Sequence, residues 1–179
     1  MGKRIESLTP HLEQFIAEQK MFFVGTAMSE GHINISPKGL DTLRVLSSNR
    51  VIWLNLTGSG NETAAHILES NRITLMFCAF EGKPLILRLY GTAKVYHERD
   101  AMFTELISHF PDLEGSRQIF DVQIDLVQTS CGFGVPLMDY NGERTILKDW
   151  ADKKGDAGIK AYWKEKNTVS LDGKETGIF

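Results

Sequence analysis

The sequence predicts a mainly β fold of the α+β class, an antiparallel barrel with peripheral helices. About six segments have the apolar pattern and length of strands, and short turns rather than regular crossover helices join most of them. Short turns favour antiparallel neighbours, because a parallel pair needs a long crossover connection. The predicted strands are 21–27, 32–36, 51–56, 73–80, 85–96 and 119–127. Since the 179 residues contain no linker or repeat, we expect a single domain over 1–179.

The first part of the chain predicts a helix followed by a hairpin. Thr9 suits an N-cap and Pro10 suits the first position of a helix, so we expect segment 8–20 to be helical. The apolar run 21–27 is followed by a polar turn, and 32–36 alternates with period two. Two such runs around a short turn predict a β-hairpin.

The rest of the chain mixes apolar strands with a few helices. The strand 51–56 leads through a glycine-containing turn into a predicted helix over 62–70. Apolar residues at helical spacing predict another helix over 99–109. The tail over 130–179 is mixed, with a helix expected around 159–166. These helices are too few to connect every pair of strands, which supports the antiparallel arrangement.

Composition argues against several classes of function. The net charge of −3 provides no basic surface, so we expect no nucleic-acid partner. No apolar run reaches the roughly 18 residues that a membrane helix needs, so we expect no membrane partner. Cys78 and Cys131 are far apart and no signal-peptide core is present, which predicts free thiols in a cytoplasmic protein. The five histidines are scattered, so we expect no metal site.

The segment Ser36-Pro37-Lys38-Gly39 is the first candidate binding site. Pro37 cannot donate to a strand ladder, and Gly39 allows a ligand to approach the backbone closely. Lys38 places a cation where the chain turns, which suits a phosphate or the edge of a cofactor. The alternative is an ordinary turn with an exposed lysine.

The glycine-containing turn before the helix at 62–70 is the second candidate. A turn at a helix start presents free N–H groups and the positive end of the helix dipole to an anion. The candidate residues are Asn55, Thr57, Gly58, Ser59, Asn61 and Thr63. The alternative is plain capping of the helix by Asn61 or Ser59. The segment is neither a Walker loop nor a dinucleotide fingerprint.

Arg88 is the third candidate, because it interrupts an apolar strand. It either contacts an anion from a buried position or lies on the solvent face of the strand. Cys131 has no histidine base beside it in the sequence, so we do not expect a catalytic thiol. No catalytic residue is assigned.

In this order, these segments resemble the pyridoxamine 5'-phosphate oxidase-like family of FMN-binding split barrels, over about 21–127. The segments that carry the resemblance are the hairpin end Ser36-Pro37-Lys38-Gly39 with Asp41, the strand 52–57, the helix 62–68, the strand from Asn71, the strand 87–93 and, in the tail, 131–136 and Tyr162-Trp163. The resemblance implies a six-stranded split barrel that forms a homodimer. It also implies FMN in two symmetric clefts at the subunit interface, each completed by the partner.

The resemblance further implies where FMN would lie. The phosphate would lie near Lys38 and the turn 57–63, and the flavin ring near Ser36 and Pro37. The oxidase itself carries basic residues at the helix start, whereas this chain has Asn61-Glu62-Thr63 there. A glutamate is unfavourable beside a phosphate, so Lys38, with Arg44 or Arg88, would have to balance the charge.

The function implied by the resemblance is that of an FMN-dependent oxidoreductase of unknown substrate. Its electron donor would be a nicotinamide cofactor or a small-molecule substrate. One alternative is a flavin-binding sensor or stress protein without turnover. Another is a cleft that takes haem or a deazaflavin, with His32, His66 or His97 as candidate haem ligands.

Overall fold

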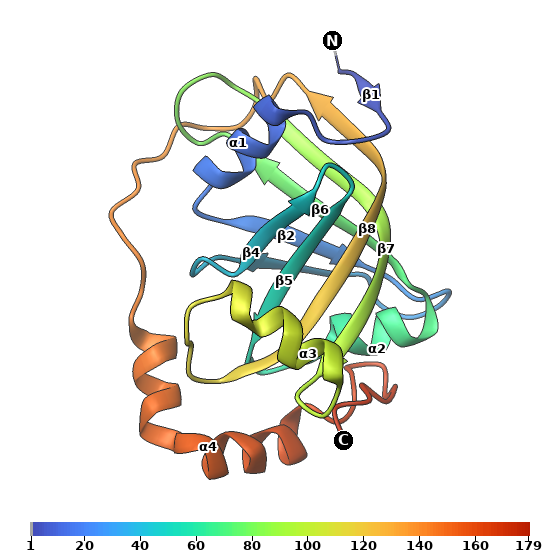
Figure 1. Ribbon diagram of the computed structural model, residues 1–179, viewed down its shortest axis with the longest axis vertical. Helices are drawn as coiled ribbons and strands as arrows, with labels where there is room; N and C mark the ends of the chain where they lie inside the picture. The colour runs from blue at the N-terminus through green and yellow to red at the C-terminus, as the bar shows by residue number, and fades with distance from the viewer. Residues whose placement is uncertain (1) are drawn as a thin grey trace.

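Residues 2–179 are described by a computed structural model, in which eight antiparallel strands form one strongly curled sheet. The strand order is β3-β2-β6-β7-β8-β5-β4, and β1 pairs with β8 beside this path. The edge strands β3 and β4 are not paired with each other, so the barrel is open on one side (Figure 1). The strands are β1 (Arg4–Ile5), β2 (Phe22–Thr26), β3 (Asn34–Lys38), β4 (Leu43–Ser47), β5 (Arg50–Leu56), β6 (Arg72–Cys78), β7 (Ile86–His97) and β8 (Ser116–Ser130).

The predicted antiparallel barrel with peripheral helices is confirmed, but the number of strands differs. Six strands were expected, and the structure adds β1 and β4. The strand β1 has only two residues, which is too short to show a period. The strand β4 is half-buried along most of its length, so its residues do not alternate between apolar and polar. The predicted hairpin is confirmed as the antiparallel pair β2–β3.

Four helices surround the barrel: α1 (Pro10–Glu18), α2 (Glu62–Glu69), α3 (Ala101–Leu106), extended by the 3-10 turn Ile107–His109, and α4 (Ile146–Lys166). The predicted start of α1 is confirmed, because the Thr9 side chain accepts a hydrogen bond from the N–H of Leu12 and Pro10 is its first residue. Helix α4 begins well before the expected residue 159 and is interrupted at Gly155, where φ is 62°. No helix within 2–179 has both the length and the apolar character needed to cross a membrane.

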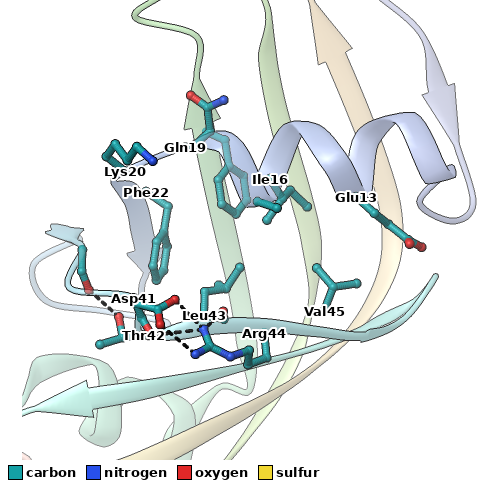
Figure 2. A pocket seen from close by; sticks show the side chains of 13 residues that line it. Glu13, Ile16, Gln19, Lys20, Phe22, Asp41, Thr42, Leu43, Arg44 and Val45 are labelled. Carbon is teal, nitrogen blue, oxygen red and sulfur yellow. Dashed lines mark hydrogen bonds and ion pairs between the residues drawn. The ribbon is translucent and has the colours of Figure 1, made fainter. Parts of the chain in front are cut away.

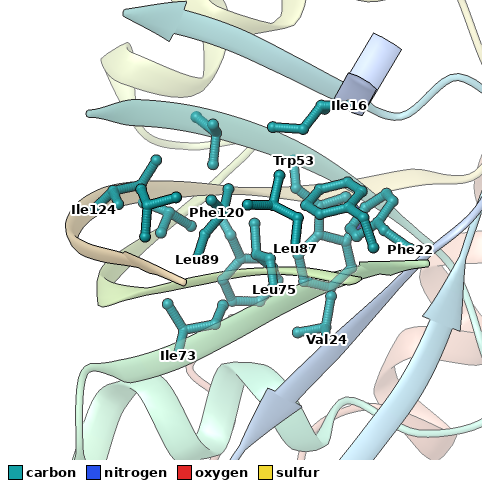
Figure 3. Close-up of a cluster of buried hydrophobic side chains, with 14 of the residues drawn as sticks. Ile16, Phe22, Val24, Trp53, Ile73, Leu75, Leu87, Leu89, Phe120 and Ile124 are labelled. Carbon is teal, nitrogen blue, oxygen red and sulfur yellow. The ribbon is translucent and has the colours of Figure 1, made fainter. Parts of the chain in front are cut away.

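The interior of the barrel is filled by apolar side chains from every long strand (Figure 3). The rings of Trp53 and Phe120 stack at 4.7 Å, and the rings of Phe22 and Phe77 lie 5.7 Å apart. A second cluster lies outside β5 and β8, where α3 covers Ile52. Strand β5 is therefore buried on both faces, which explains why 51–56 is an almost unbroken apolar run.

Two local features shape the barrel. The register of β7 against β8 shifts at Gly91, where a Cβ atom would overlap the carbonyl oxygen of Gln123. Between β3 and β4, Leu40 and Asp41 both have positive φ, at 61° and 57°. A non-glycine residue pays about 1–2 kcal/mol for this conformation. The strained turn directly follows the Ser36–Gly39 segment of the first candidate site.

Candidate functional site

Lys38 is a cation at the end of β3 that lacks an anionic partner. Its Nζ atom lies 5.0 Å from the centre of the Trp53 ring. Burial, together with the positive charge of Arg117, lowers the pKa of Lys38 from 10.5 to about 8. No Asp or Glu within 2–179 forms an ion pair with it. A desolvated charge is costly unless it is paired, so this position favours an anionic ligand.

Lys38 opens onto a groove of about 630 Å³, which we call the Lys38 groove. Pro37, Lys38 and Gly39 form one wall, and the segment 140–150 forms the opposite wall. The groove also contains the aromatic rings of Tyr140 and Trp150. Its volume lies in the range of small-molecule sites. Three cations (Lys20, Lys38 and Arg144) and one carboxylate (Glu143) line it, so the lining is net positive and, with its aromatic rings, suits a planar, anionic ligand.

A separate cavity of about 340 Å³ lies on the open side of the barrel, between α1 and β4 (Figure 2). Arg44 crosses it and forms a bidentate pair with the carboxylate of Asp41, at 2.7 and 2.9 Å. Its Nε atom also donates to the carbonyl of His109. Arg44 is therefore already paired, and its charge is not free to balance a phosphate.

The turn before α2 is covered by the C-terminal part of the chain. The hydroxyl of Thr57 accepts from Trp163 Nε1 at 2.7 Å and donates to the carbonyl of Gly115 at 2.8 Å. The carbonyl of Gly58 accepts from Asn167 Nδ2 at 3.1 Å. Protein groups therefore occupy much of the turn that the sequence suggested for a phosphate. Gly58 and Ser59 keep exposed surface.

Asn61 occupies the N-cap position of α2, but its side chain does not cap the helix, so the capping alternative is wrong for this side chain. Its side chain makes no cap hydrogen bond. It is buried instead, where it exchanges hydrogen bonds with the Gln118 side chain, at 2.6 and 3.4 Å, and donates to the carbonyl of Asn167. Asn55 is also buried, on β5, in register with Gln118.

Glu62 has a structural role that explains its place at the helix start. Its carboxylate accepts a hydrogen bond from the N–H of Leu171 at 2.9 Å. The side chain therefore holds the tail against α2. Glu62 at the helix start is therefore explained by its contact with the tail and not by a bound phosphate.

Among the predicted residues, Ser36 and Thr63 lie close together and Arg88 lies apart. Asn34 Nδ2 donates to the hydroxyls of Ser36, at 3.4 Å, and Thr63, at 3.1 Å, which joins β3 to the start of α2. Arg88 lies on the same face of the sheet as Pro37 but three strands away, across Phe23 and Met76. Lys38 projects to the opposite face, because side chains alternate along a strand. Arg88 Nη1 donates to Ser130.

Arg117 is a buried cation that the sequence did not reveal. It lies where the register of β8 against β5 shifts, between Ser116 and Gln118. An extra residue at such a bulge re-aims its side chain. The Nη1 atom donates to the carbonyl of Gly60 at 3.0 Å and to Asn167 Oδ1 at 2.8 Å. Burial lowers the pKa of Arg117 to about 10, so it stays charged at neutral pH.

The three candidate haem ligands lie away from the Lys38 groove. His32 is bonded to the carboxylate of Asp172 at 2.6 Å, and His66 is buried against the hydroxyl of Thr26 at 3.0 Å. His97 lines a different, smaller cavity. Within 2–179, no three His, Cys, Asp or Glu side chains are grouped so that they could hold a metal ion.

Comparison with known proteins gives consistent matches. The model of the pyridoxamine 5'-phosphate oxidase family matches residues 8–131. The pyridoxamine 5'-phosphate oxidase family protein ustO of Aspergillus flavus is 42% identical over 186 aligned positions, which cover 94% of this chain and 75% of that protein.

Two solved structures show that the fold is shared. A variant of HupZ from Group A Streptococcus has a TM-score of 0.56 at 18% identity, over 69% of this chain and 99% of that one. A protein from Clostridium acetobutylicum related to general stress protein 26 has a TM-score of 0.51 at 17% identity, over 68% of this chain and 86% of that one.

Proposed function

Because the chain belongs to the pyridoxamine 5'-phosphate oxidase family, we propose that it binds FMN in the Lys38 groove and acts as an FMN-dependent oxidoreductase. The observation that carries the proposal is the partly buried Lys38, which has no ion-pair partner within 2–179, at the edge of a groove of about 630 Å³. A phosphate would supply the anion that this lysine lacks.

The residues of the groove fit the chemistry of the cofactor. Lys38 would hold the phosphate, and the wall of Pro37 and Gly39 would contact the flavin. FMN supplies the electron-transfer chemistry when bound, so the protein needs to provide position, charge and shelter from water rather than a nucleophile. Neither cysteine contributes to the Lys38 groove: Cys78 is buried and Cys131 is exposed outside its lining.

A second copy of the chain is part of the proposal. The outer face of β3, β2 and β6 carries a shallow groove of about 520 Å³ that includes Ile33 and Ile35. These two side chains are 74% and 69% exposed, which is unusual for neighbouring isoleucines. Pro37 weakens the hydrogen-bonding edge of β3, so association through the face of the sheet is favoured over strand addition at its edge.

The first experiment is an absorption spectrum of the purified protein, with any chromophore released by heat and identified by mass. We expect FMN. Apoprotein should then be titrated with FMN and with riboflavin, which lacks the phosphate. Lys38→Met should weaken FMN binding about tenfold or more, because a charge-assisted hydrogen bond contributes about 1.5–3 kcal/mol, and should leave riboflavin binding nearly unchanged.

Lys83→Met is the matched control, because Lys83 is exposed and lies outside the Lys38 groove. Apoprotein that binds neither flavin would overturn the cofactor proposal. An equal loss of affinity for FMN and for riboflavin in Lys38→Met would show that Lys38 does not bind the phosphate. Bound FMN that no nicotinamide cofactor or candidate substrate reduces would contradict the oxidoreductase part alone and leave a flavin-binding protein without turnover.

A further inference from the structure

His97 and Arg117 are buried side chains with nitrogen atoms that have no hydrogen-bond partner. His97 is 5% exposed and Arg117 is 3% exposed. Both ring nitrogens of His97 and the Nε atom of Arg117 lack partners within 2–179. Buried polar groups almost always find a partner, so three such atoms on two neighbouring residues require an explanation.

Both residues line one cavity of about 180 Å³, which we call the His97–Arg117 cavity. The cavity is bounded by the end of β7, the start of β8, α4 and the segment 178–179. Three cations and one carboxylate line it: Arg99, Arg117, Lys160 and Glu98.

Most of these charges are already engaged by the protein. Lys160 pairs with Glu98 at 3.5 Å and with Asp156 at 3.3 Å. Arg99 donates to the carbonyls of Gly177 and Ile178. Arg117 alone among them is deeply buried, and no carboxylate of residues 2–179 forms an ion pair with it.

We propose that the His97–Arg117 cavity binds a small oxyanion, of the size of inorganic phosphate, at a site separate from the Lys38 groove. Within 2–179, the protein contacts of Arg117 all come from Nη1, which leaves the edge formed by Nε and Nη2 to donate two parallel hydrogen bonds. That edge matches the oxygens of a phosphate or carboxylate. The imidazole of His97 would donate a further hydrogen bond from one ring nitrogen.

An oxyanion explains the cavity better than water does. Ordered water could satisfy the ring nitrogens of His97, but it would leave the guanidinium of Arg117 buried without a counter-charge. Burial and the positive charges of Arg99 and Arg117 lower the pKa of His97 to about 4, against the opposing effect of Asp100. A neutral His97 offers one N–H donor beside the cation Arg117, and the positive charge of Arg117 makes the cavity attractive to an anion.

The site is tested by NMR of protein labelled with ¹⁵N-histidine, titrated with inorganic phosphate at constant ionic strength and neutral pH. The His97 signals are assigned from their loss in His97→Gln. We expect a saturable shift of the His97 ring nitrogens and a rise in the His97 pKa when phosphate is present. The exposed His11, which lies outside the cavity, should not shift in this way.

Variants separate the site from a general salt effect. Arg117→Met should abolish the saturable shift, with circular dichroism as the check on folding. Lys160→Met is the second variant, because Lys160 is partly exposed and the fold should tolerate its loss. It should weaken phosphate binding about fivefold. Lys153→Met, on the same helix but outside the cavity, is its matched control.

Three outcomes would overturn the proposal. One is a linear shift that does not saturate at tens of millimolar phosphate, which would indicate water only. Another is equal weakening in Lys160→Met and Lys153→Met. The third is loss of the phosphate response when the protein is saturated with FMN, which would make this cavity part of the cofactor site. Because FMN binding is measured independently, failure of either site leaves the other one testable.

Discussion

Lys38 is a partly buried cation that lies over the Trp53 ring. No carboxylate within 2–179 forms an ion pair with it. The Lys38 pKa of about 8 means that the free protein loses this charge within an accessible pH range. The ordinary value is 10.5, so the unfolded chain still holds the proton between pH 8 and pH 10.5. Burial of the charged form is thus a cost to folding that disappears as the pH rises through this range.

This shift predicts opposite effects of pH on stability and on FMN binding. The free energy of unfolding should gain a contribution as the pH rises from 8 toward 10.5, and Lys38→Met should lack that contribution. FMN affinity should fall above pH 8, where free Lys38 becomes neutral, whereas riboflavin affinity should not follow. Urea unfolding and flavin titration at matched pH values measure both. A wild-type protein whose pH dependence equals that of Lys38→Met would contradict the assignment.

Strands β7 and β8 form the longest pair in the barrel, and Gly91 marks the place where their register shifts. The Cβ of any other residue there would overlap the Gln123 carbonyl. Gly25, on β2, provides a contrast, because a Cβ there would make only ordinary contacts at 3.8 and 3.9 Å with Thr74. Both glycines lie within strands, but only the position of Gly91 has no room for a side chain.

Gly91→Ala should lower the free energy of unfolding by about 3 kcal/mol, because two backbones would have to separate. Gly25→Ala should be neutral or stabilise by up to about 1 kcal/mol, because alanine restricts the unfolded chain. Chemical unfolding of both variants checks this pair. Similar values for the two substitutions would mean that the β7–β8 bulge accommodates a side chain.

The local elements could be predicted from the sequence, whereas the contacts between distant segments could not. Thr9, Pro10 and the alternation in 32–36 act over a few residues, so α1 and the first hairpin followed from pattern alone. The bulge that aims Arg117 depends on the register between two strands, and a single strand pattern does not encode it. The covering of Gly58 by Asn167 joins residues 109 positions apart, which no local signal shows.

The candidate site divides in the same way. Lys38 was predicted because Pro37 and Gly39 mark a strand end in the sequence. Arg88 belongs to an equally suggestive strand, but its alternation places it on the opposite face from Lys38. Segment 140–150, which forms the other wall of the Lys38 groove, lacks a recognisable motif and was described only as part of a mixed tail.

Across the whole molecule, the outer face of the sheet is covered on one side of the barrel and, within 2–179, uncovered on the other. The inner face is packed with apolar side chains, and the outer face of β5 and β8 is covered by α3. The outer face of β3, β2 and β6 has no such cover within 2–179, yet it carries Ile33 and Ile35. A second copy is the partner proposed for this face.

Ile35→Glu should convert the proposed dimer to a monomer, because it places a charge in the centre of an apolar contact. Leu137→Glu is the matched control, since Leu137 is 80% exposed and lies outside the lining of this groove. Sedimentation velocity measures the result. A wild-type protein that sediments as a monomer at all concentrations would contradict the proposed partner.

The contacts made by Trp163, Asn167 and Leu171 on the turn before α2 also bear on how the chain is made. A ribosome releases the barrel strands well before residues 163–171, so the nascent barrel has the carbonyl of Gly58 in water and lacks the hydrogen bond from Trp163 to Thr57. Only when the tail emerges can Asn167 settle between Asn61 and Arg117. A translation product that ends before Asn167 would keep its strands but would lack the hydrogen bonds that join Asn167 to Asn61 and Arg117.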